Sequence, residues 1–387
     1  MLAALALASG CGGGDDGNGD GTRAQRPVTG PEAAPPLGFP GVATSNTTRI
    51  AGADHVADAA GVAQAVYPAR SDDTRPPAVA LVDDTDWRVA ISAAQLMAPP
   101  LRAPLLYSKG TAMPAVTLQA LLTLRPRGAK EAGDAQVIRI GDAARPRGFR
   151  TADVQGADFA ALAQAIDRLH TEAAGEPSPA VVVASSEQPG YAMPAAAWAA
   201  KSGTAVLWVT RDLVPPATRA AIEAHEKPRI YVLGPETAVS EGVVSELEEL
   251  GTVRRIGDRD PVANAIDFAR FSDGSFGWNV VDPGHGLVFA STQRPQDAGA
   301  AAPLSATGTY GPLLLLTEPN VLPPAVQDFL LDIQPGYRED PVRGVYNHGW
   351  LIGDERAVTI DVQARIDTLL QIVPVDSGSE SDSAPGS

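Results

Sequence analysis

An acidic run directly after an apolar strand could bind a cation. Residues 79–82, Val-Ala-Leu-Val, are typical of a buried strand, and Asp83, Asp84 and Asp86 follow them. Carboxylate oxygens are the ligands that Ca²⁺ and Mg²⁺ prefer. The other ligands of an oxygen cage are not evident in the sequence, whereas an Asp ahead of a helix is a common N-cap. The run therefore favours a solvated loop or a helix N-terminus over a metal site.

Catalytic motifs are absent from the sequence. No Gly-x-Ser-x-Gly elbow, Walker loop or Gly-x-Gly-x-x-Gly motif follows a predicted strand. The sequence therefore gives no motif on which an α/β-hydrolase or a nucleotide-binding site could be argued. The five histidines show no metal-ligand spacing, and we expect surface or helix-end positions for them. They are His55, His170, His225, His285 and His348. We expect no enzymatic activity, no cofactor and no metal ion.

Lysine and arginine lie at the ends of predicted strands. Lys109 and Arg211 each follow an apolar run, whereas the third run of this kind leads to Glu318. In open parallel sheets, ligands bind beyond the carboxyl ends of the strands. Arg102 and Lys201 lie near the starts of the same two runs. These four cations are the candidates for contact with an anionic ligand, and solvated surface charges are the alternative.

Three kinds of segment recur along the chain and predict how these residues are positioned. Two stretches, 233–247 and 352–366, are so similar that they must be copies of one structural unit. A Gly-Ala-Asp-like signature before a helix occurs three times, and so does an apolar strand that is often opened by Pro. The signature residues are Gly52 and Asp54, Gly156 and Asp158, and Gly257 and Asp260; the strands begin at Pro104-Leu105-Leu106, Ala205 and Pro312-Leu313-Leu314; a glycine follows a later strand at Gly141, Gly234 and Gly353.

These segments return at a spacing of about one small domain, on the order of 100 residues, which predicts three tandem repeats. Short apolar strands alternate with helices, and continuous apolar runs favour parallel sheets that are covered on both faces. The predicted fold class is α/β, with three Rossmann-like modules at residues 49–153, 154–253 and 254–374. The first module should lack the helix that follows the turn glycine in the other two, because no apolar period follows Gly141.

The single cysteine lies at the end of an apolar N-terminal run. Residues 1–11 resemble a bacterial lipoprotein signal, in which Cys11 would become diacylated and form the new N-terminus. An ordinary apolar N-terminus is the alternative, because the run is too short to span a bilayer. Residues 12–48, rich in Gly, Asp, Pro and Thr, are expected to form a disordered tether, and residues 375–387 a disordered tail.

The recurring segments together are similar to the cell wall-binding repeat 2 family of bacterial envelope proteins. The similarity rests on Arg49-Ile-Ala-Gly-Ala-Asp54 ahead of an alanine-rich helix, on the Pro-Leu-Leu strands and on the Gly-x-x-x-Ala-Val-Ser/Thr blocks, and it covers residues 49–374. It implies three repeats in a compact, pseudo-threefold arrangement that hold the protein non-covalently to an anionic cell-wall polymer. The polymer would then contact the four cations named above. With a lipid on Cys11, the protein would be extracytoplasmic and anchored to the cell membrane.

The composition limits the partners and leaves one other function open. A net charge of −16 argues against nucleic-acid binding, and we expect a monomer. The alternative to a wall-binding module is the substrate-binding lipoprotein of a transporter, which is also an anchored α/β protein. Such a receptor has two lobes around one hinge, into which three copies do not fold naturally. Two lobes with a central cleft would therefore favour the receptor.

Overall fold

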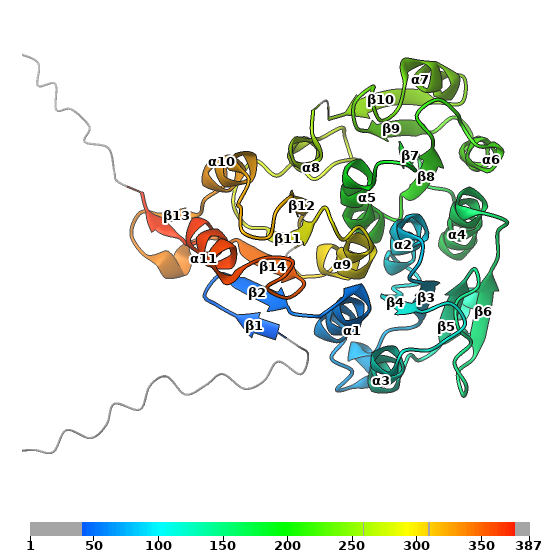
Figure 1. The fold of residues 1–387 in the computed structure, drawn as a ribbon, viewed down its shortest axis with the longest axis horizontal. Helices are drawn as coiled ribbons and strands as arrows, with labels where there is room; N and C mark the ends of the chain where they lie inside the picture. The colour runs from blue at the N-terminus through cyan, green and yellow to red at the C-terminus, as the bar shows by residue number, and fades with distance from the viewer. Residues whose placement is uncertain (1–40, 258, 309, 376–387) are drawn as a thin grey trace, which may run out of the picture. The chain divides into compact units, whose positions relative to one another are not determined.

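Three parallel sheets, one for each repeat, form the fold (Figure 1). The computed structural model describes residues 41–257, 259–308 and 310–375, which belong to one compact unit. Strand order follows one scheme: the second strand of a repeat lies at the edge, followed by the first strand, the third strand and a closing strand. Strands alternate with helices along the chain. The predicted α/β class with Rossmann-like modules is confirmed.

The first strand of each repeat is buried along almost its whole length, as a strand covered on both faces must be. The first sheet has the order β4 (Leu105–Ser108), β3 (Val79–Asp83), β5 (Val137–Ile140) and β6 (Thr151–Val154). The second has the order β8 (Ala205–Val209), β7 (Ala180–Ser185), β9 (Arg229–Leu233) and β10 (Thr252–Ile256). The third has the order β12 (Leu313–Leu316), β11 (Gly286–Ser291), β14 (His348–Ile352) and β2 (Thr47–Ile50), with β1 (Gly41–Ala43) antiparallel at the edge. A separate pair consists of β13 (Gly336–Tyr337) and β15 (Val373–Pro374).

The closing strand of the third sheet comes from the N-terminal end of the chain. Residues 47–50 pair in parallel with residues 349–352 of β14, and all four residues of β2 are buried. The predicted first module begins at residue 49, inside this strand. The prediction of a disordered tether up to residue 48 is wrong for residues 41–48, which contain β1 and the start of β2, because pairing with β14 orders them. The first and second sheets close with β6 and β10 before the chain crosses to the next repeat. Up to residue 375, where the described part of the chain ends, the third repeat supplies no strand of its own at this position, and β2 completes the ring of repeats.

Three helices that follow the first strand of each repeat pack against one another in the middle of the molecule (Figure 1). They are α2 (Trp87–Ala93, continued by a 3₁₀ turn at Ala94–Met97), α5 (Pro189–Ser202) and α9 (Gln296–Ala306). Their axes approach closely because small residues line the contacts. A Cβ at Gly299 would lie 2.7 Å from the carbonyl oxygen of Ala90. The repeats surround these helices, as a pseudo-threefold arrangement requires.

A second set of helices carries the chain from one sheet into the next repeat. These are α1 (His55–Val66), α4 (Phe159–Ala174) and α8 (Pro261–Arg270). Each begins at a signature aspartate, because the side chains of Asp54, Asp158 and Asp260 accept hydrogen bonds from N–H groups of the first turn. The preceding glycine lies against the same turn. A Cβ at Gly156 would lie only 2.5 Å from the backbone nitrogen of Leu162, so no side chain fits there.

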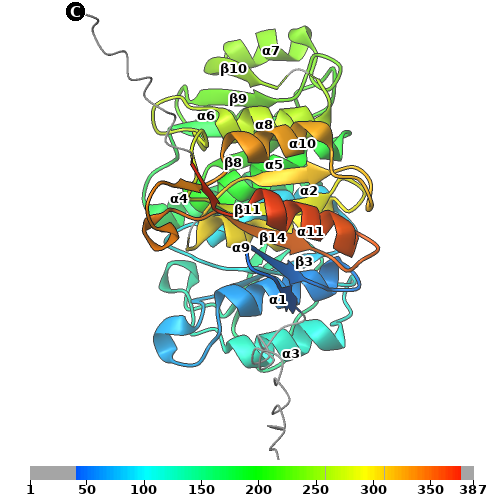
Figure 2. The same cartoon turned by 90° about the vertical axis from the view of Figure 1, so that its left-hand side faces the viewer.

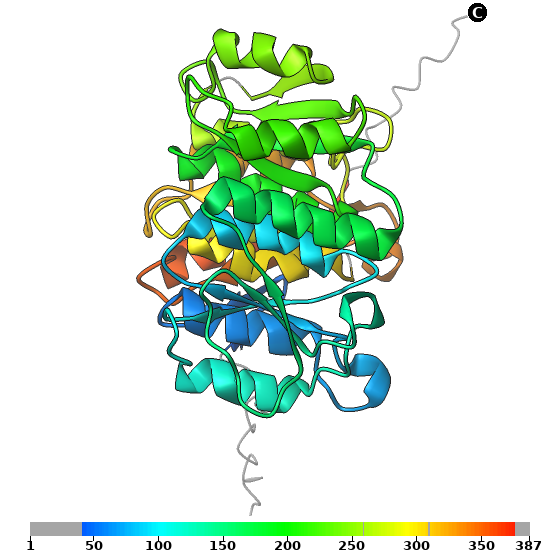
Figure 3. The same cartoon turned by 90° about the vertical axis from the view of Figure 1, so that its right-hand side faces the viewer.

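The remaining helices lie outside the sheets. Figure 2 faces the third repeat and shows α10 beside α11, and Figure 3 looks onto the first and second repeats, where α4 packs against α2 and α6. The outer helices are α3 (Ala115–Leu124), α6 (Pro216–Ala224), α7 (Glu241–Glu248), α10 (Pro324–Asp332) and α11 (Ile360–Leu369), and short 3₁₀ turns occur at Asp72–Thr74, Lys130–Ala132 and Pro341–Arg343. Residues 142–150 form only turns and loop, which confirms that the first repeat lacks the counterpart of α7 and α11. Within the described ranges, no helix combines the length and apolar character needed to cross a bilayer.

Candidate functional site

Each sheet brings three turns together at the carboxyl ends of its strands. One turn follows the first strand, the second contains the glycine after the third strand, and the last is the Gly-Asp turn after the closing strand. The turn glycines Gly141, Gly234 and Gly353 all have positive φ, at 61°, 103° and 97°, which explains why this position uses glycine. We call the three resulting places the first, second and third crevice.

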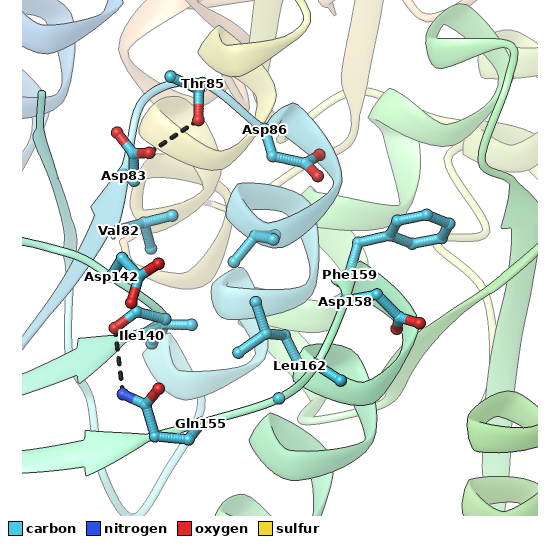
Figure 4. Close-up of a pocket in the computed structure, with 14 residues that line it drawn as sticks. Val82, Asp83, Thr85, Asp86, Ile140, Asp142, Gln155, Asp158, Phe159 and Leu162 are labelled. Atoms are coloured by element: carbon cyan, nitrogen blue, oxygen red, sulfur yellow. Dashed lines mark hydrogen bonds between the residues drawn. The ribbon is translucent and has the colours of Figure 1, made fainter. Parts of the chain in front are cut away.

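The first crevice contains a cavity of about 260 Å³ (Figure 4). Its floor is apolar, with Val82, Val89 and Leu162 from three different elements. Its rim is acidic and includes Asp83, Asp86, Asp142 and Asp158. The missing helix after Gly141 leaves this side of the sheet without the cover that α7 and α11 give the other repeats. An acidic rim over an apolar floor repels anions.

Two carboxylates of the first crevice, Asp83 and Asp86, are already engaged by the protein. Asp83 accepts hydrogen bonds from the Thr85 hydroxyl at 2.7 Å and from the Gly110 amide at 2.8 Å. Asp86 caps α2 and forms an ion pair with Arg88 at 2.8 Å. The helix-cap interpretation of the acidic run is therefore confirmed for Asp86. Among the described residues, no group of three or more His, Cys, Asp and Glu side chains is arranged to hold a metal ion.

The second crevice is filled by a tyrosine. The Tyr191 ring lies against the turn glycine, where a Cβ at Gly234 would be 3.2 Å from its Cγ. The Tyr191 hydroxyl donates a hydrogen bond to the carbonyl oxygen of Arg259 at 2.6 Å, and the Asn264 amide donates to the Tyr191 carbonyl oxygen at 3.4 Å. The side chain thus occupies the space that stays open in the first crevice.

The third crevice differs by carrying arginines. A cavity of about 270 Å³ is lined by Ala53, Asp54, His55, Arg294, Asp354, Arg356 and Ala357. Arg356 is largely exposed, forms an ion pair with Asp354 at 2.7 Å and donates a hydrogen bond to the Ala53 carbonyl oxygen. Arg294 extends from the turn after β11 and reaches inward. Unlike the cavity of the first crevice, this one is lined by guanidinium groups, which recognise phosphate or carboxylate.

Behind this cavity, Arg294 is held by two carboxylates that are completely buried. It lies 2.5 Å from Asp58 on α1 and 2.9 Å from Asp297 on α9. Burial and the charge of Asp297 raise the pKa of Asp58 to about 8, although Arg294 opposes the shift. Burial likewise raises the pKa of Asp297 to about 7, again against Arg294. We call Asp58, Arg294 and Asp297 the ion trio.

The two carboxylates of the ion trio, Asp58 and Asp297, occupy positions that are apolar or neutral in the other repeats. Val89 and Leu162 correspond to Asp297 and Asp58 in the first repeat, and Tyr191 and Asn264 correspond to them in the second. The third repeat therefore places buried carboxylates behind a cavity that is lined by arginines.

The structure brings one predicted cation to the third crevice. The Lys109 ammonium lies 3.9 Å from the Asp54 carboxylate, which lines that cavity, and both side chains are about half exposed. Arg211 forms an ion pair with its neighbour Asp212 at 2.9 Å in the second repeat. Arg102 lies in the turn before β4, with a positive φ of 45°.

Lys201, the fourth predicted cation, faces aromatic rings instead of a crevice. Its ammonium lies 5.0 Å from the Trp198 ring, 5.1 Å from the Trp278 ring and 5.2 Å from the Tyr310 ring. Burial lowers the pKa of Lys201. These cation–π contacts account for its position without a ligand.

Sequence reasoning missed Arg294, Arg356 and Asp58. Arg356 stands inside the repeated stretch 352–366, opposite Thr237 of the other copy. Arg294 stands after β11 where Asp86 stands after β3. Comparing the copies for charged residues at strand ends would have found both arginines. Asp58 gives no such signal, because a buried carboxylate on a helix resembles an exposed one in sequence.

The fold resembles that of two bacterial surface proteins. No protein-family model matches the chain, and no curated protein matches it in sequence. Among solved structures, it is similar to Cwp6 from Clostridium difficile, with a TM-score of 0.64 and 16% sequence identity over 84% of this chain and 48% of that chain. Cwp8 from Clostridium difficile gives a TM-score of 0.63 and 16% identity over 84% of this chain and 52% of that chain. Both are cell wall proteins, and the present chain spans about half the length of each.

Proposed function

We propose that the three repeats attach the protein non-covalently to an anionic glycopolymer of the bacterial cell envelope. The observation that carries the proposal is the fold shared with two cell wall proteins over 84% of the chain. The same folded region contains the segments that resemble wall-binding repeats. A cell-wall-associated, extracytoplasmic location follows from this proposal. The role is binding without catalysis, and no cofactor takes part.

The third crevice is the part of the carboxyl-end surface best suited to an anionic polymer. It combines Arg294 and Arg356 with nearby Lys109, whereas the first crevice has an acidic rim. Long-range repulsion from the net charge of −16 is screened over roughly 8 Å at physiological salt, so a few local cations can bind a phosphate at short range. Arg211 lies in another repeat and would contribute only to a polymer that extends across the surface.

Membrane attachment through a lipid on Cys11 is the second part of the proposal. Cys11, the signal at 1–11, most of the tether at 12–48 and residues 376–387 lie outside the described residues. The support is the apolar run that ends in Ala8-Ser9-Gly10-Cys11. Two acyl chains give stable membrane anchoring, whereas one gives only marginal binding. Cys11→Ser should release the protein from the membrane or leave it unprocessed.

The transporter receptor lacks structural support. The described residues form three sheets around three central helices, with no division into two lobes. A substrate-binding protein that closes by a hinge needs two such lobes.

Co-sedimentation with purified cell walls of the encoding bacterium tests the attachment. The soluble protein should sediment with intact walls, and retention should fall when phosphate-bearing glycopolymers are removed or salt is added. Arg356→Glu should weaken retention at least tenfold. Arg343→Glu is the matched control, because it reverses one charge in the exposed turn that precedes β14, at the opposite edge of the third sheet. Equal retention of both variants, or no retention of the wild type, would argue against the proposal.

A further inference from the structure

The third strands of the second and third repeats carry an aromatic side chain at the same place. Tyr231 is the third residue of β9 and pairs with Val182, and Trp350 is the third residue of β14 and pairs with Val288. In the second repeat, the Phe276 ring stacks face to face on Tyr231, with 3.5 Å between centroids and 4° between planes. This repeat therefore shows how a flat ring is held at this position.

The third repeat has a cavity where the second repeat has rings. The cavity, which we call the amino-edge pocket, measures about 450 Å³. It is lined by Ala65, Val66, Gly286, Leu304, Thr307, Gly308, His348 and Trp350. Counted from equivalent helix caps and strand ends, Ala65 stands in the place of Phe271 and Leu304 in the place of Trp198. Both of these rings border Phe276 in the second repeat, at 6.1 and 5.0 Å.

Compared with the second repeat, the pocket therefore lacks the rings of Phe271 and Trp198. It also lacks a counterpart of Phe276, the ring that would stack on Trp350. Trp350 keeps one aromatic neighbour, His348, whose ring meets it edge-on at 5.3 Å and 69°. The indole of Trp350 lines the pocket and offers it an aromatic surface, on which one further flat group can pack.

Polar groups around the pocket are uncharged. No Asp, Glu, Lys or Arg lines it, and burial lowers the pKa of His348, so that its imidazole is neutral near pH 7. The Thr307 hydroxyl lies at the end of α9, and the last carbonyl groups of α1 and α9 point toward this edge. The Thr307 hydroxyl already donates to the Pro303 carbonyl oxygen at 3.1 Å, and His348 Nε2 is paired with the Thr48 hydroxyl at 3.1 Å. The Thr307 oxygen, the Nδ1 of His348 and the helix-end carbonyls are the groups left for a ligand, and none of them can neutralise an anion.

We propose that the amino-edge pocket binds an uncharged sugar ring, stacked on Trp350 as Phe276 stacks on Tyr231. A pyranose has an apolar C–H face for the indole and hydroxyl groups along its edge for Thr307, His348 and the helix-end carbonyls. A free aromatic compound would contact only the indole and would leave the polar groups at the border without hydrogen bonds. These polar groups therefore favour a sugar. The inference goes beyond the proposed wall attachment, because the pocket lies at the opposite edge of the sheet from the third crevice and needs no charge on its ligand.

Saturation-transfer NMR with neutral pyranosides tests the site. Methyl β-glucoside, N-acetylglucosamine and N-acetylmannosamine are the probes, and the wild type should transfer magnetisation to the ring C–H protons of at least one. Ala65→Phe introduces the ring that the second repeat has at this position and should abolish the transfer. Trp350→Leu removes the stacking face and should do the same.

Tyr346→Leu is the matched control, because it removes an exposed aromatic ring of the same repeat that does not line the pocket. It should leave the transfer unchanged. If Trp350→Leu lowers the melting temperature, its loss of transfer could come from unfolding. The result with Ala65→Phe then decides whether the pocket binds the sugar, because this variant fills a cavity and removes no contact. Phenol, tested in the same way, serves as the aromatic comparison. No transfer from the wild type to any sugar probe, transfer to phenol alone, or unchanged transfer with Ala65→Phe would overturn the proposal. Wall retention through the third crevice is measured separately and does not depend on this outcome.

Discussion

The guanidinium of Arg294 lies 2.5 Å from the carboxylate of Asp58, although 236 positions separate the two residues. The contact joins α1, the first helix of the described chain, to the third repeat. Asp297 lies on the other side of the same guanidinium, so two buried carboxylates share one cation. Such a group costs desolvation energy, and one of the two carboxylates binds a proton readily.

The first prediction is that the ion trio makes stability depend on pH. The pKa of Asp58 is raised to about 8 and that of Asp297 to about 7, whereas Asp in an unfolded chain has a pKa of about 3.9. Between the unfolded pKa of about 3.9 and the raised pKa values of about 7 and about 8, the folded state therefore binds more protons than the unfolded state. Its stabilisation is complete below about pH 4 and is lost as pH rises through 7 to 8. Urea unfolding should show that the free energy of unfolding falls as the pH rises, and Asp58→Asn should make this dependence on pH weaker.

Replacing Arg294, the cation of the ion trio, is a second test of this group. Arg294→Met leaves both carboxylates without their cation, with Asp58 keeping only the hydrogen bond from the Gly52 amide, and should destabilise the protein by about 3–5 kcal/mol at pH 8. The loss should be smaller at pH 5, where the carboxylates are protonated. A loss that is the same at both pH values would contradict the trio as described.

The second prediction concerns His225, which is buried between α6 and α4. Its Nε2 lies 2.8 Å from Asp167 and its Nδ1 lies 2.7 Å from the Ser178 carbonyl oxygen. Burial alone would lower the pKa of His225, but the hydrogen bond and charge of Asp167 raise it above the ordinary value. The stabilisation is therefore present at low pH and lost as pH rises through this raised pKa.

Asp167→Asn should reverse that shift. NMR titration should then give a His225 pKa below the ordinary value, and stability at pH 6 should fall by about 2–4 kcal/mol. His348, whose pKa burial lowers, should titrate unchanged and serves as the internal control. An unaltered His225 titration would show that Asp167 does not set its protonation.

The third prediction concerns the signature glycines. Gly156→Ala should destabilise the protein by about 2–4 kcal/mol, because the new methyl group would meet the backbone of α4. Gly242→Ala is the matched control. It lies in α7 with its nearest neighbour at 3.6 Å and should stabilise the helix by about 0.5–1 kcal/mol. Equal effects in thermal unfolding would contradict the close approach at Gly156.

The sequence predicts the repeats well because local features specify them. An aspartate at a helix cap and a glycine in a tight turn act within a few residues, so their recurrence at Asp54, Asp158 and Asp260 is visible without a structure. The partner of β2 is not visible, because it lies near the other end of the chain. The third crevice was missed for the same reason, since Asp58 and Arg294 meet only through the closed ring. Lys201 was misleading, because a lysine that packs on tryptophans resembles a surface charge in sequence.

The fourth prediction concerns Lys109 and Arg211, the cations expected from their strand-end positions. Lys109→Glu combined with Arg211→Glu should abolish wall retention while changing stability by less than about 1 kcal/mol, because both side chains are more than half exposed. Most of the loss should come from Lys109, which lies beside the third crevice. Comparing the two single variants in wall co-sedimentation checks this. Equal contributions would place the polymer across two repeats, and unchanged retention would remove these cations from the site.

The last prediction is that β2 holds the third repeat together. Ile50 of this strand is fully buried, and its burial alone contributes about 2–3 kcal/mol. Arg49 is also buried and donates hydrogen bonds to Gln363 at 2.8 Å and to the Gly353 carbonyl oxygen at 3.0 Å. A chain that begins at residue 51 would leave the backbone edge of β14 unpaired, and such an edge pairs readily with other chains.

A chain of residues 41–387 is the matched control, because it keeps β1 and β2. It should melt as the full chain does, whereas residues 51–387 should melt at a clearly lower temperature or aggregate. Hydrogen exchange should lose protection in β14 before β3 or β7, because only the third sheet depends on the N-terminal strand. Equal melting temperatures for the two chains would mean that β14 is stable as an edge strand and that the ring of repeats does not need to close.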